Sequence, residues 1–274
     1  MKNRVVYGAM LIVIMTGCVF LSPITRILFF TAAGGLCAWE YSRQMEKTQS
    51  RVSLGVMIFY LILHAFLVLT NAGITAYCTA FIGCVYLALL AGIVMDKVRG
   101  RGALDTLAGL SYPCLLLAVI MVISVSDIWL ETLVIACLST WVCDTAAFLG
   151  GQRFGKHKLD EAISPNKTVE GVVFGVASSL LVGVFVYYLG IWCQRAHYVG
   201  QLYTAVPLWL CVVTSLIAST FGQIGDLAES LVKRMLGIKD FSDLIPGHGG
   251  MFDRADSLLF SIPAAYLCLR LAGL

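Results

Sequence analysis

Apolar residues occur along this chain in runs long enough to cross a membrane, and short polar segments separate the runs. A spanning helix needs about 20 mostly apolar residues to cross about 30 Å of hydrocarbon. On this criterion we predict nine spans, roughly at residues 5–22, 24–41, 52–70, 73–95, 104–124, 128–149, 168–190, 206–228 and 254–272. The pattern therefore predicts an all-α polytopic membrane protein with about nine transmembrane helices.

Composition agrees with this prediction. The chain is 59% hydrophobic and only 13% charged, which is typical of polytopic membrane proteins. No linker rich in proline, serine or charge divides it, so we expect a single transmembrane domain over 1–274. Residues 2–22 have a basic start and an apolar run, as a signal peptide does. No small-residue cleavage site is evident before Pro23, and we expect an uncleaved first helix.

The basic residues predict the orientation of the chain. Nine spans with a cytoplasmic N-terminus place 16 of the 19 lysines and arginines on the cytoplasmic side. Only Arg26, Arg195 and Arg270 then fall outside. We therefore expect the C-terminus outside, and we read the net charge of +3 as a signal of topology, not of nucleic-acid binding.

Cysteines and glycines within the spans point to packing. The ten cysteines include no Cys-x-x-Cys pair, which argues against a zinc site or a disulfide framework. Glycines such as Gly83, Gly183 and Gly225 favour close contacts between helices.

Carboxylates gather at four consecutive helix ends, all at the cytoplasmic leaflet of the predicted topology. Ionisable groups in membrane helices are costly and are functional candidates by default. Residues three apart share a helix face, which makes two acidic pairs, and close carboxylates repel one another unless cations lie between them. Oxygen ligands of this kind favour Mg²⁺ or a similar ion. The six carboxylates are Asp144, Glu170, Asp226, Glu229, Asp253 and Asp256.

A simpler interpretation exists for single residues in this set. Asp253 and Asp256 could favour a helix N-terminus, and Glu229 could end a helix in solvent. The joint arrangement favours a metal and phosphate site, because four cations accompany it in the sequence: Lys233, Arg234, Lys239 and Arg254.

Two cytoplasmic loops, roughly 150–167 and 229–253, are basic and contain glycine. In the second loop, glycines around His248 let backbone N–H groups face an anion. In the first loop, Thr168 is positioned to cap the next helix, whose N-terminus would suit phosphate. Attraction of the first loop to anionic lipid is the alternative.

Long sequence patterns in this region resemble the phosphatidate cytidylyltransferases, also called CDP-diacylglycerol synthases. The patterns are Asp144-Thr145-Ala146-Ala147, Ile163-Ser164-Pro165-x-Lys167-Thr168-x-Glu170-Gly171, Ser230-x-Val232-Lys233-Arg234, Lys239-Asp240-x-Ser242 and Ile245-Pro246-x-His248-Gly249-Gly250-Met251-x-Asp253-Arg254-x-Asp256. The resemblance covers about 144–256, which we take as the catalytic portion facing the cytoplasm.

The resemblance implies transfer of the cytidylyl group of CTP to phosphatidate, giving CDP-diacylglycerol and pyrophosphate. It implies Mg²⁺ with a second cation such as K⁺, a homodimer, and a place in the cell inner (plasma) membrane. As metal ligands it implies Asp226, Asp253, Asp256 and Asp144. As catalytic residues it implies Asp226, Asp253, Lys233, Arg254 and His248. As substrate-binding residues it implies Lys167, Ser230, Arg234, Lys239, Gly249 and Gly250.

Two other classes of protein place carboxylates in membrane helices. A lipid-alcohol phosphotransferase would carry a dense Asp-Gly-x-x-Ala-Arg run, which this sequence lacks. A polytopic transporter would carry acidic residues near span centres in both halves of the chain. Here the charges gather at one leaflet and in the C-terminal half, which favours the enzyme.

Overall fold

The computed structural model describes residues 17–95, 101–195, 206–245 and 249–274. The chain divides into two compact units. The first unit comprises Met1–Val125 and Met235–Ala255, and the second comprises Ser126–Arg234 and Asp256–Leu274.

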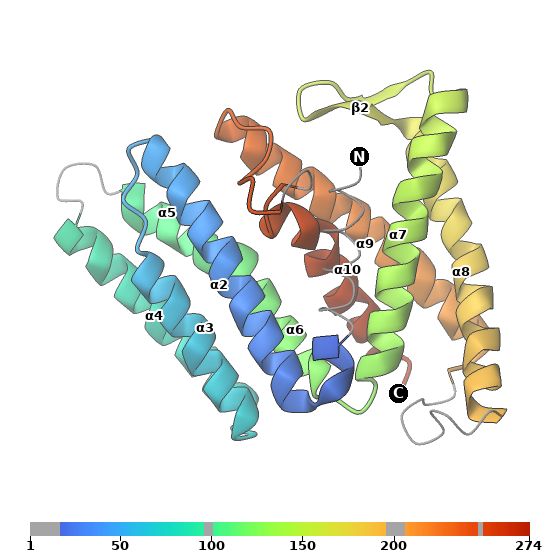
Figure 1. Ribbon diagram of the computed structural model, residues 1–274, viewed down its shortest axis with the longest axis horizontal. Coiled ribbons are helices and arrows are strands. Elements are labelled where there is room, and N and C mark those ends of the chain that lie inside the picture. Colours follow the sequence, from blue (N-terminus) through green and yellow to red (C-terminus); the bar gives the residue numbers. More distant parts are fainter. Residues whose placement is uncertain (1–16, 96–100, 196–205, 246–248) are drawn as a thin grey trace. The chain divides into compact units, whose positions relative to one another are not determined.

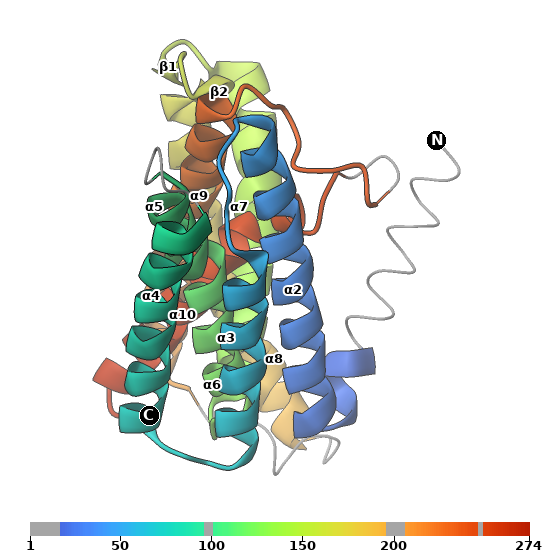
Figure 2. The same cartoon turned by 90° about the vertical axis from the view of Figure 1, so that its left-hand side faces the viewer.

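Helices build the described part of the first unit. They are α2 (Pro23–Lys47), α3 (Leu54–Leu69), α4 (Ile74–Met95), α5 (Arg101–Gly109), a π-helical segment (Leu110–Leu115) and α6 (Leu116–Ser124). α2 begins where Ser22 and Thr25 cap one another's backbone N–H groups. Figure 1 and Figure 2 both show α3 alongside α2 and α4, and α6 also packs against α2.

Large apolar side chains from α2, α3 and α6 fill the core of this unit. Gly34 of α2 lies against Leu61 and Leu117, which brings these helices close together. Close packing of this kind gains van der Waals contacts, which stabilise the association of helices within lipid. The most deeply buried residues include Ile27, Met57, Tyr60, Leu61, Ile120 and Met121.

The second unit combines long helices with one β-hairpin. Its elements are α7 (Trp129–Phe154), β1 (Lys158–Asp160), β2 (Ser164–Thr168), α8 (Val169–Arg195), α9 (Leu208–Met235) and most of α10 (Phe252–Leu271). α7 and α8 run side by side in Figure 1, and the antiparallel hairpin connects them. In the hairpin, Lys158 pairs with Thr168 and Asp160 with Ser164.

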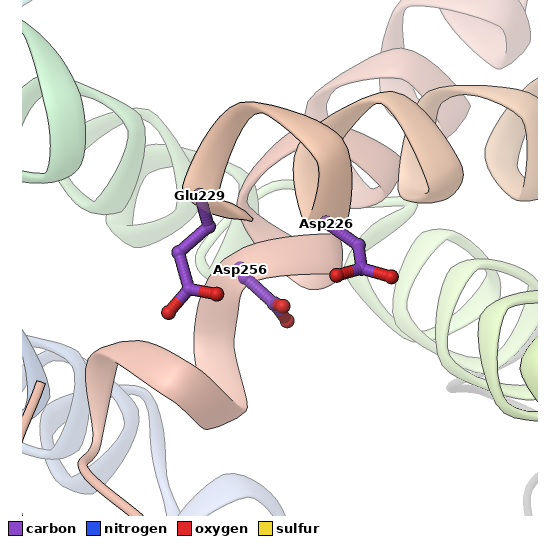
Figure 3. Close-up of side chains that lie close together, drawn as sticks. All are labelled: Asp226, Glu229 and Asp256. Carbon is purple, nitrogen blue, oxygen red and sulfur yellow. The ribbon is translucent and has the colours of Figure 1, made fainter. Parts of the chain in front are cut away.

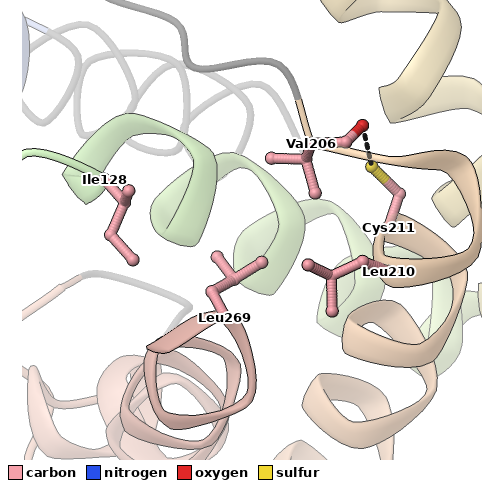
Figure 4. Close-up of a cluster of buried hydrophobic side chains, with 5 residues drawn as sticks. All are labelled: Ile128, Val206, Leu210, Cys211 and Leu269. Carbon is pink, nitrogen blue, oxygen red and sulfur yellow. Dashed lines mark hydrogen bonds between the residues drawn. The ribbon is translucent and has the colours of Figure 1, made fainter. Parts of the chain in front are cut away.

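One end of the second unit is closed by a small hydrophobic cluster (Figure 4). Leu210 and Cys211 of α9 meet Leu269 near the end of α10, with Ile128 and Val206 beside them. The cluster packs three chain segments against one another and thereby links α9 to the C-terminal part of α10.

Five helical segments in the described residues are long and apolar enough to cross a membrane. The protein is therefore an all-α membrane protein apart from its short hairpin. These segments are Ile74–Val94, Arg101–Ser124, Trp129–Phe154, Val169–Arg195 and Leu208–Met235. The other predicted ranges coincide with α2, α3 and α10, except 5–22, which lies largely outside the described residues.

Two predicted loops begin later than expected. α7 continues to Phe154, and α9 continues to Met235, so the prediction of a loop from residue 229 was wrong. Between Gly225 and Gly237 the sequence contains no glycine or proline that could end α9 earlier. Gly237 has a positive φ of 66° and lies just beyond the helix, where glycine is common. Glu229, Lys233 and Arg234 therefore lie on α9.

Glycine packing is confirmed at some positions and absent at others. A Cβ added at Gly183 of α8 would lie 2.5 Å from the Val212 Cα of α9, whereas one at Gly83 would meet nothing within 4 Å. The small side chain at Gly183 therefore allows the backbones of α8 and α9 to approach one another.

We predict that Gly183→Ala destabilises the protein and that Gly83→Ala does not. Overpacking against backbone costs about 1–3 kcal/mol, because the Val212 backbone cannot turn away as a side chain can. The measurement is the thermal unfolding midpoint of each purified variant in detergent. Equal midpoints for the two variants would contradict the close contact.

Candidate active site

Three carboxylates of the second unit converge on one point. Asp226 and Glu229 project from α9 and Asp256 projects from α10 (Figure 3). Each offers an oxygen atom, and these oxygens lie within 4.8 Å of one another. Glu229 is completely buried, and the other two are partly buried.

Local helix geometry and one glycine bring this carboxylate group together. Asp226 and Glu229 share a face of α9 because they are three residues apart. A Cβ added at Gly225 would lie 2.6 Å from the Asp256 carbonyl oxygen and 3.2 Å from the Ser257 Cα. Glycine at 225 therefore lets α10 approach α9 closely enough for Asp256 to reach the other two carboxylates.

Two lysines accompany the carboxylate group. The Lys233 Nζ lies 2.5 Å from the Glu229 Oε2, one turn along α9. The Lys167 Nζ, from strand β2, forms an ion pair with the Asp226 carboxylate. Buried charges need partners of opposite sign. The ammonium groups of the two lysines therefore offset part of the repulsion among the three carboxylates.

The carboxylate group differs in part from the ligand set that the sequence predicted. Asp226 and Asp256 lie together. Glu229 joins them; the sequence placed it in an acidic pair with Asp226, but the ligand set implied by the resemblance did not include it. Its spacing from Asp226 was the signal that pointed to it. Asp144 of α7 is outside this group, but its carboxyl group interacts electrostatically with Asp226 and Asp256.

Glu170 faces the hairpin. Its Oε2 accepts hydrogen bonds from the Lys156 and His157 backbone N–H groups at 3.1 and 3.2 Å, and its Oε1 lies 2.6 Å from the His157 Nδ1. The Thr168 Oγ1 accepts the Gly171 N–H at 3.1 Å, which confirms Thr168 as the cap of α8. Glu170 thus fixes the base of the hairpin that carries Lys167.

The substrate-binding residues predicted on α9 have different surroundings. Ser230 is buried on the helix, whereas Arg234 is exposed at its end. The Arg234 Nε donates a hydrogen bond of 3.2 Å to the Ile163 carbonyl oxygen at the hairpin turn. Arg234 therefore links the end of α9 to the hairpin.

The remaining predicted residues belong to the first unit. Asp253 is buried as a residue, with 7% of its surface exposed, and its Oδ2 accepts hydrogen bonds from the Phe241 and Gly250 backbone N–H groups at 2.9 and 2.8 Å. Gly249 has a positive φ of 81°, and Lys239 and Arg254 are exposed. His248 lies outside the described residues.

Sequence reasoning missed Glu40. This carboxylate of α2 is completely buried and accepts backbone N–H groups at the start of α10. The signal was present in the sequence, because Glu40 is an acidic residue within the predicted apolar span 24–41. Its partners could not be identified from the sequence, since they lie in the C-terminal part of the chain.

We predict that Glu170→Ala loosens the hairpin. The change removes a charged acceptor with several bonds to the loop. Trypsin cleavage after Lys156 and Lys158 should therefore accelerate about threefold or more, a modest factor because these bonds are exposed to solvent. Cleavage is followed by mass spectrometry. Glu161→Ala, in the exposed turn of the hairpin, is the control and should cleave as the wild type does. Equal rates for both variants would show that Glu170 does not hold the hairpin.

Comparison with known proteins agrees with the resemblance noted in the sequence. The model of the cytidylyltransferase family matches residues 2–272. Phosphatidate cytidylyltransferase of Staphylococcus saprophyticus is 41% identical over 142 residues, which are 51% of this chain and 49% of that protein. The proteins of the same name from Staphylococcus haemolyticus and Staphylococcus aureus are 39% and 40% identical over 140 residues, with the same coverage.

The matched segment thus spans about half the length of these curated relatives, whereas the family model extends over nearly the whole chain. The protein belongs to the cytidylyltransferase family.

Proposed function

We propose that the protein transfers the cytidylyl group of CTP to phosphatidate, forming CDP-diacylglycerol and pyrophosphate. The observation that carries the proposal is the carboxylate group Asp226, Glu229 and Asp256 with its two lysines, in a chain of the cytidylyltransferase family. The names of the relatives from Staphylococcus supply the lipid substrate. In this reaction a phosphatidate oxygen bonds to the α-phosphorus of CTP, and the bond from that phosphorus to the pyrophosphate oxygen breaks.

The carboxylate group fits a magnesium ion. Its donors are carboxylate oxygens close enough together to share one ion, and Mg²⁺ prefers such ligands. Asp226, Glu229 and Asp256 would hold it, with Asp144 in a supporting place. Bound there, the ion would neutralise charge on the phosphates of the nucleotide. A second cation such as K⁺ is part of the same proposal.

The lysines and arginines of the signature would orient the phosphates. Lys167 and Lys233 already lie against the carboxylates and provide positive charge beside the proposed ion. From the resemblance we assign Lys239, Arg254 and His248 to the CTP phosphates. Phosphoryl chemistry of this kind depends mainly on positioning and charge neutralisation. The phosphate nucleophile is already an anion near neutral pH, so the residues need not act as a general base.

For the chain in its membrane, we propose nine spans with the N-terminus in the cytoplasm and the C-terminus outside. The distribution of lysine and arginine supports this arrangement, as do the helices at eight of the predicted ranges. The active site would then face the cytoplasm at the inner leaflet of the cell membrane, where a lipid headgroup meets a soluble nucleotide. A homodimer, implied by the resemblance, completes the proposal.

We predict that the purified protein releases pyrophosphate from CTP only when phosphatidate and Mg²⁺ are both present. Asp256→Asn should lower the rate at least about 100-fold, because it removes a charged oxygen from the metal group. The assay measures pyrophosphate and CDP-diacylglycerol together. Glu46→Gln, an exposed change on α2, is the control and should keep full activity. Release without phosphatidate, or none with it, would contradict the function.

A metal titration tests the carboxylate group without any substrate. We predict that Mn²⁺, a paramagnetic substitute for Mg²⁺, binds the wild-type protein and that Asp256→Asn weakens this binding about tenfold or more, because one of three close carboxylates is lost. Electron paramagnetic resonance measures the unbound Mn²⁺. Glu161→Gln should bind as the wild type does. Equal affinity for wild type and Asp256→Asn would show that the metal lies elsewhere.

A further inference from the structure

Glu40 contacts one distant segment of the chain with both carboxylate oxygens. The Ser242 Oγ–H and the Met251 N–H donate to its Oε1 at 2.6 and 2.9 Å. The Phe252 N–H donates to its Oε2 at 2.8 Å. Glu40 is completely buried, and these partners lie 202 to 212 residues further along the sequence.

The charge of Glu40 is matched to a helix end. Met251 and Phe252 stand at the N-terminus of α10, where the first backbone N–H groups have no acceptor within the helix. The helix dipole also makes this end partly positive. Glu40 therefore satisfies donors that would otherwise be buried without partners, and the helix end compensates a carboxylate that would be very costly to bury alone.

Other side chains hold Phe241, which precedes Ser242 in the same part of the chain. The Asp253 Oδ2 accepts hydrogen bonds from both the Phe241 and the Gly250 backbone N–H groups. The Gln44 side chain, one turn along α2 from Glu40, donates to the Phe241 carbonyl oxygen. The ring centroids of Phe241 and Phe252 lie 4.5 Å apart, and both residues are buried. Phe241 and the residues Gly250–Asp253 are thus joined to one another, and both are bonded to α2.

Glycine at position 250 follows from the same contact. A Cβ added there would lie 2.5 Å from the Glu40 Oε1 and 2.7 Å from its Oε2. Three hydrogen bonds hold that carboxylate in place, so it could move aside only by giving them up. The glycine of the signature at this position therefore serves the approach of Glu40.

We infer that Glu40 is a positioning residue for the reaction. It holds Ser242, Met251 and Phe252 against α2 and so sets the place of the neighbouring Gly249, Gly250 and Asp253, which the family signature contains. Its buried carboxylate faces backbone N–H groups, so it acts through this segment. The inference rests on the proposed function, because the resemblance behind that function implies catalysis for Asp253 and substrate binding for Gly249 and Gly250.

Glu40→Gln is the discriminating variant. All three groups that face Glu40 are donors, and the amide would turn its own N–H₂ toward at least one backbone N–H. Hydrogen exchange followed by mass spectrometry should show amides of residues 249–255 exchanging about tenfold faster, while α3 (Leu54–Leu69) keeps its wild-type rates. Glu46→Gln, the exposed glutamate of the same helix, should leave both regions unchanged.

The activity of the same variants is the second readout. With both substrates saturating, Glu40→Gln should lower kcat about 10- to 100-fold, because small misplacements of reacting groups have effects of this size. Glu46→Gln should retain the wild-type kcat. If Glu40→Gln cannot be purified folded, Ser242→Ala removes one donor and Gly250→Ala displaces the carboxylate. Each should accelerate exchange at residues 249–255.

The outcomes separate the inference from the proposed function. Wild-type exchange and kcat in Glu40→Gln would overturn the inference, as would faster exchange throughout α2, α3 and α6, which would mean a general loss of stability. Faster local exchange with unchanged kcat would also overturn the positioning role. A wild-type protein that is inactive with CTP and phosphatidate would contradict the proposed function, and the exchange rates would still decide whether Glu40 holds the segment.

Discussion

A carboxylate within an apolar helix needs a cation or hydrogen-bond donors beside it, and the structure of this protein depends on which groups provide them. Burying a charge without compensation costs several kcal/mol, a large part of the about 5–15 kcal/mol by which a protein is stable. The chain meets this constraint in two ways. Asp226 and Glu229 are paired with lysines. Glu40, Asp253 and Glu170 accept backbone N–H groups.

The two kinds of partner suit different chemistry. A lysine ammonium can move away when a metal ion or a phosphate arrives, since its stem is flexible and its charge is compact. A backbone N–H group in a helix end or a loop cannot move without unfolding that element. Lysine-paired carboxylates are therefore suited to exchange cations during a reaction, whereas N–H-bonded carboxylates are suited to hold the chain in shape.

The proposed metal site and the supporting elements follow this division. In the second unit, Glu170 fixes the hairpin whose strand β2 brings Lys167 to Asp226. In the first unit, Glu40 and Asp253 fasten the segment that ends at α10. Glycine permits the close approach in each unit, at Gly225 beside Asp256 and at Gly250 beside Glu40. A side chain at either position would separate the groups that the carboxylates need to reach.

The sequence alone determined where most of the described helices lie, though not where α7 and α9 end. It also determined the cap at Thr168 and the neighbourhood of Asp226 and Glu229. These features depend on the length of apolar runs and on spacing along one helix. The long signature also determined the family, which the comparisons confirmed. The hairpin was not predicted, since its strands are short and contain Pro165, and its base is held by Glu170 from the following helix. Only the tertiary structure decided which distant partners the carboxylates meet. Glu40 reaches Phe252 across 212 residues of sequence, and Asp256 reaches Asp226 because two helices pack at a glycine. Such partners are chosen by helix packing, which no local pattern encodes.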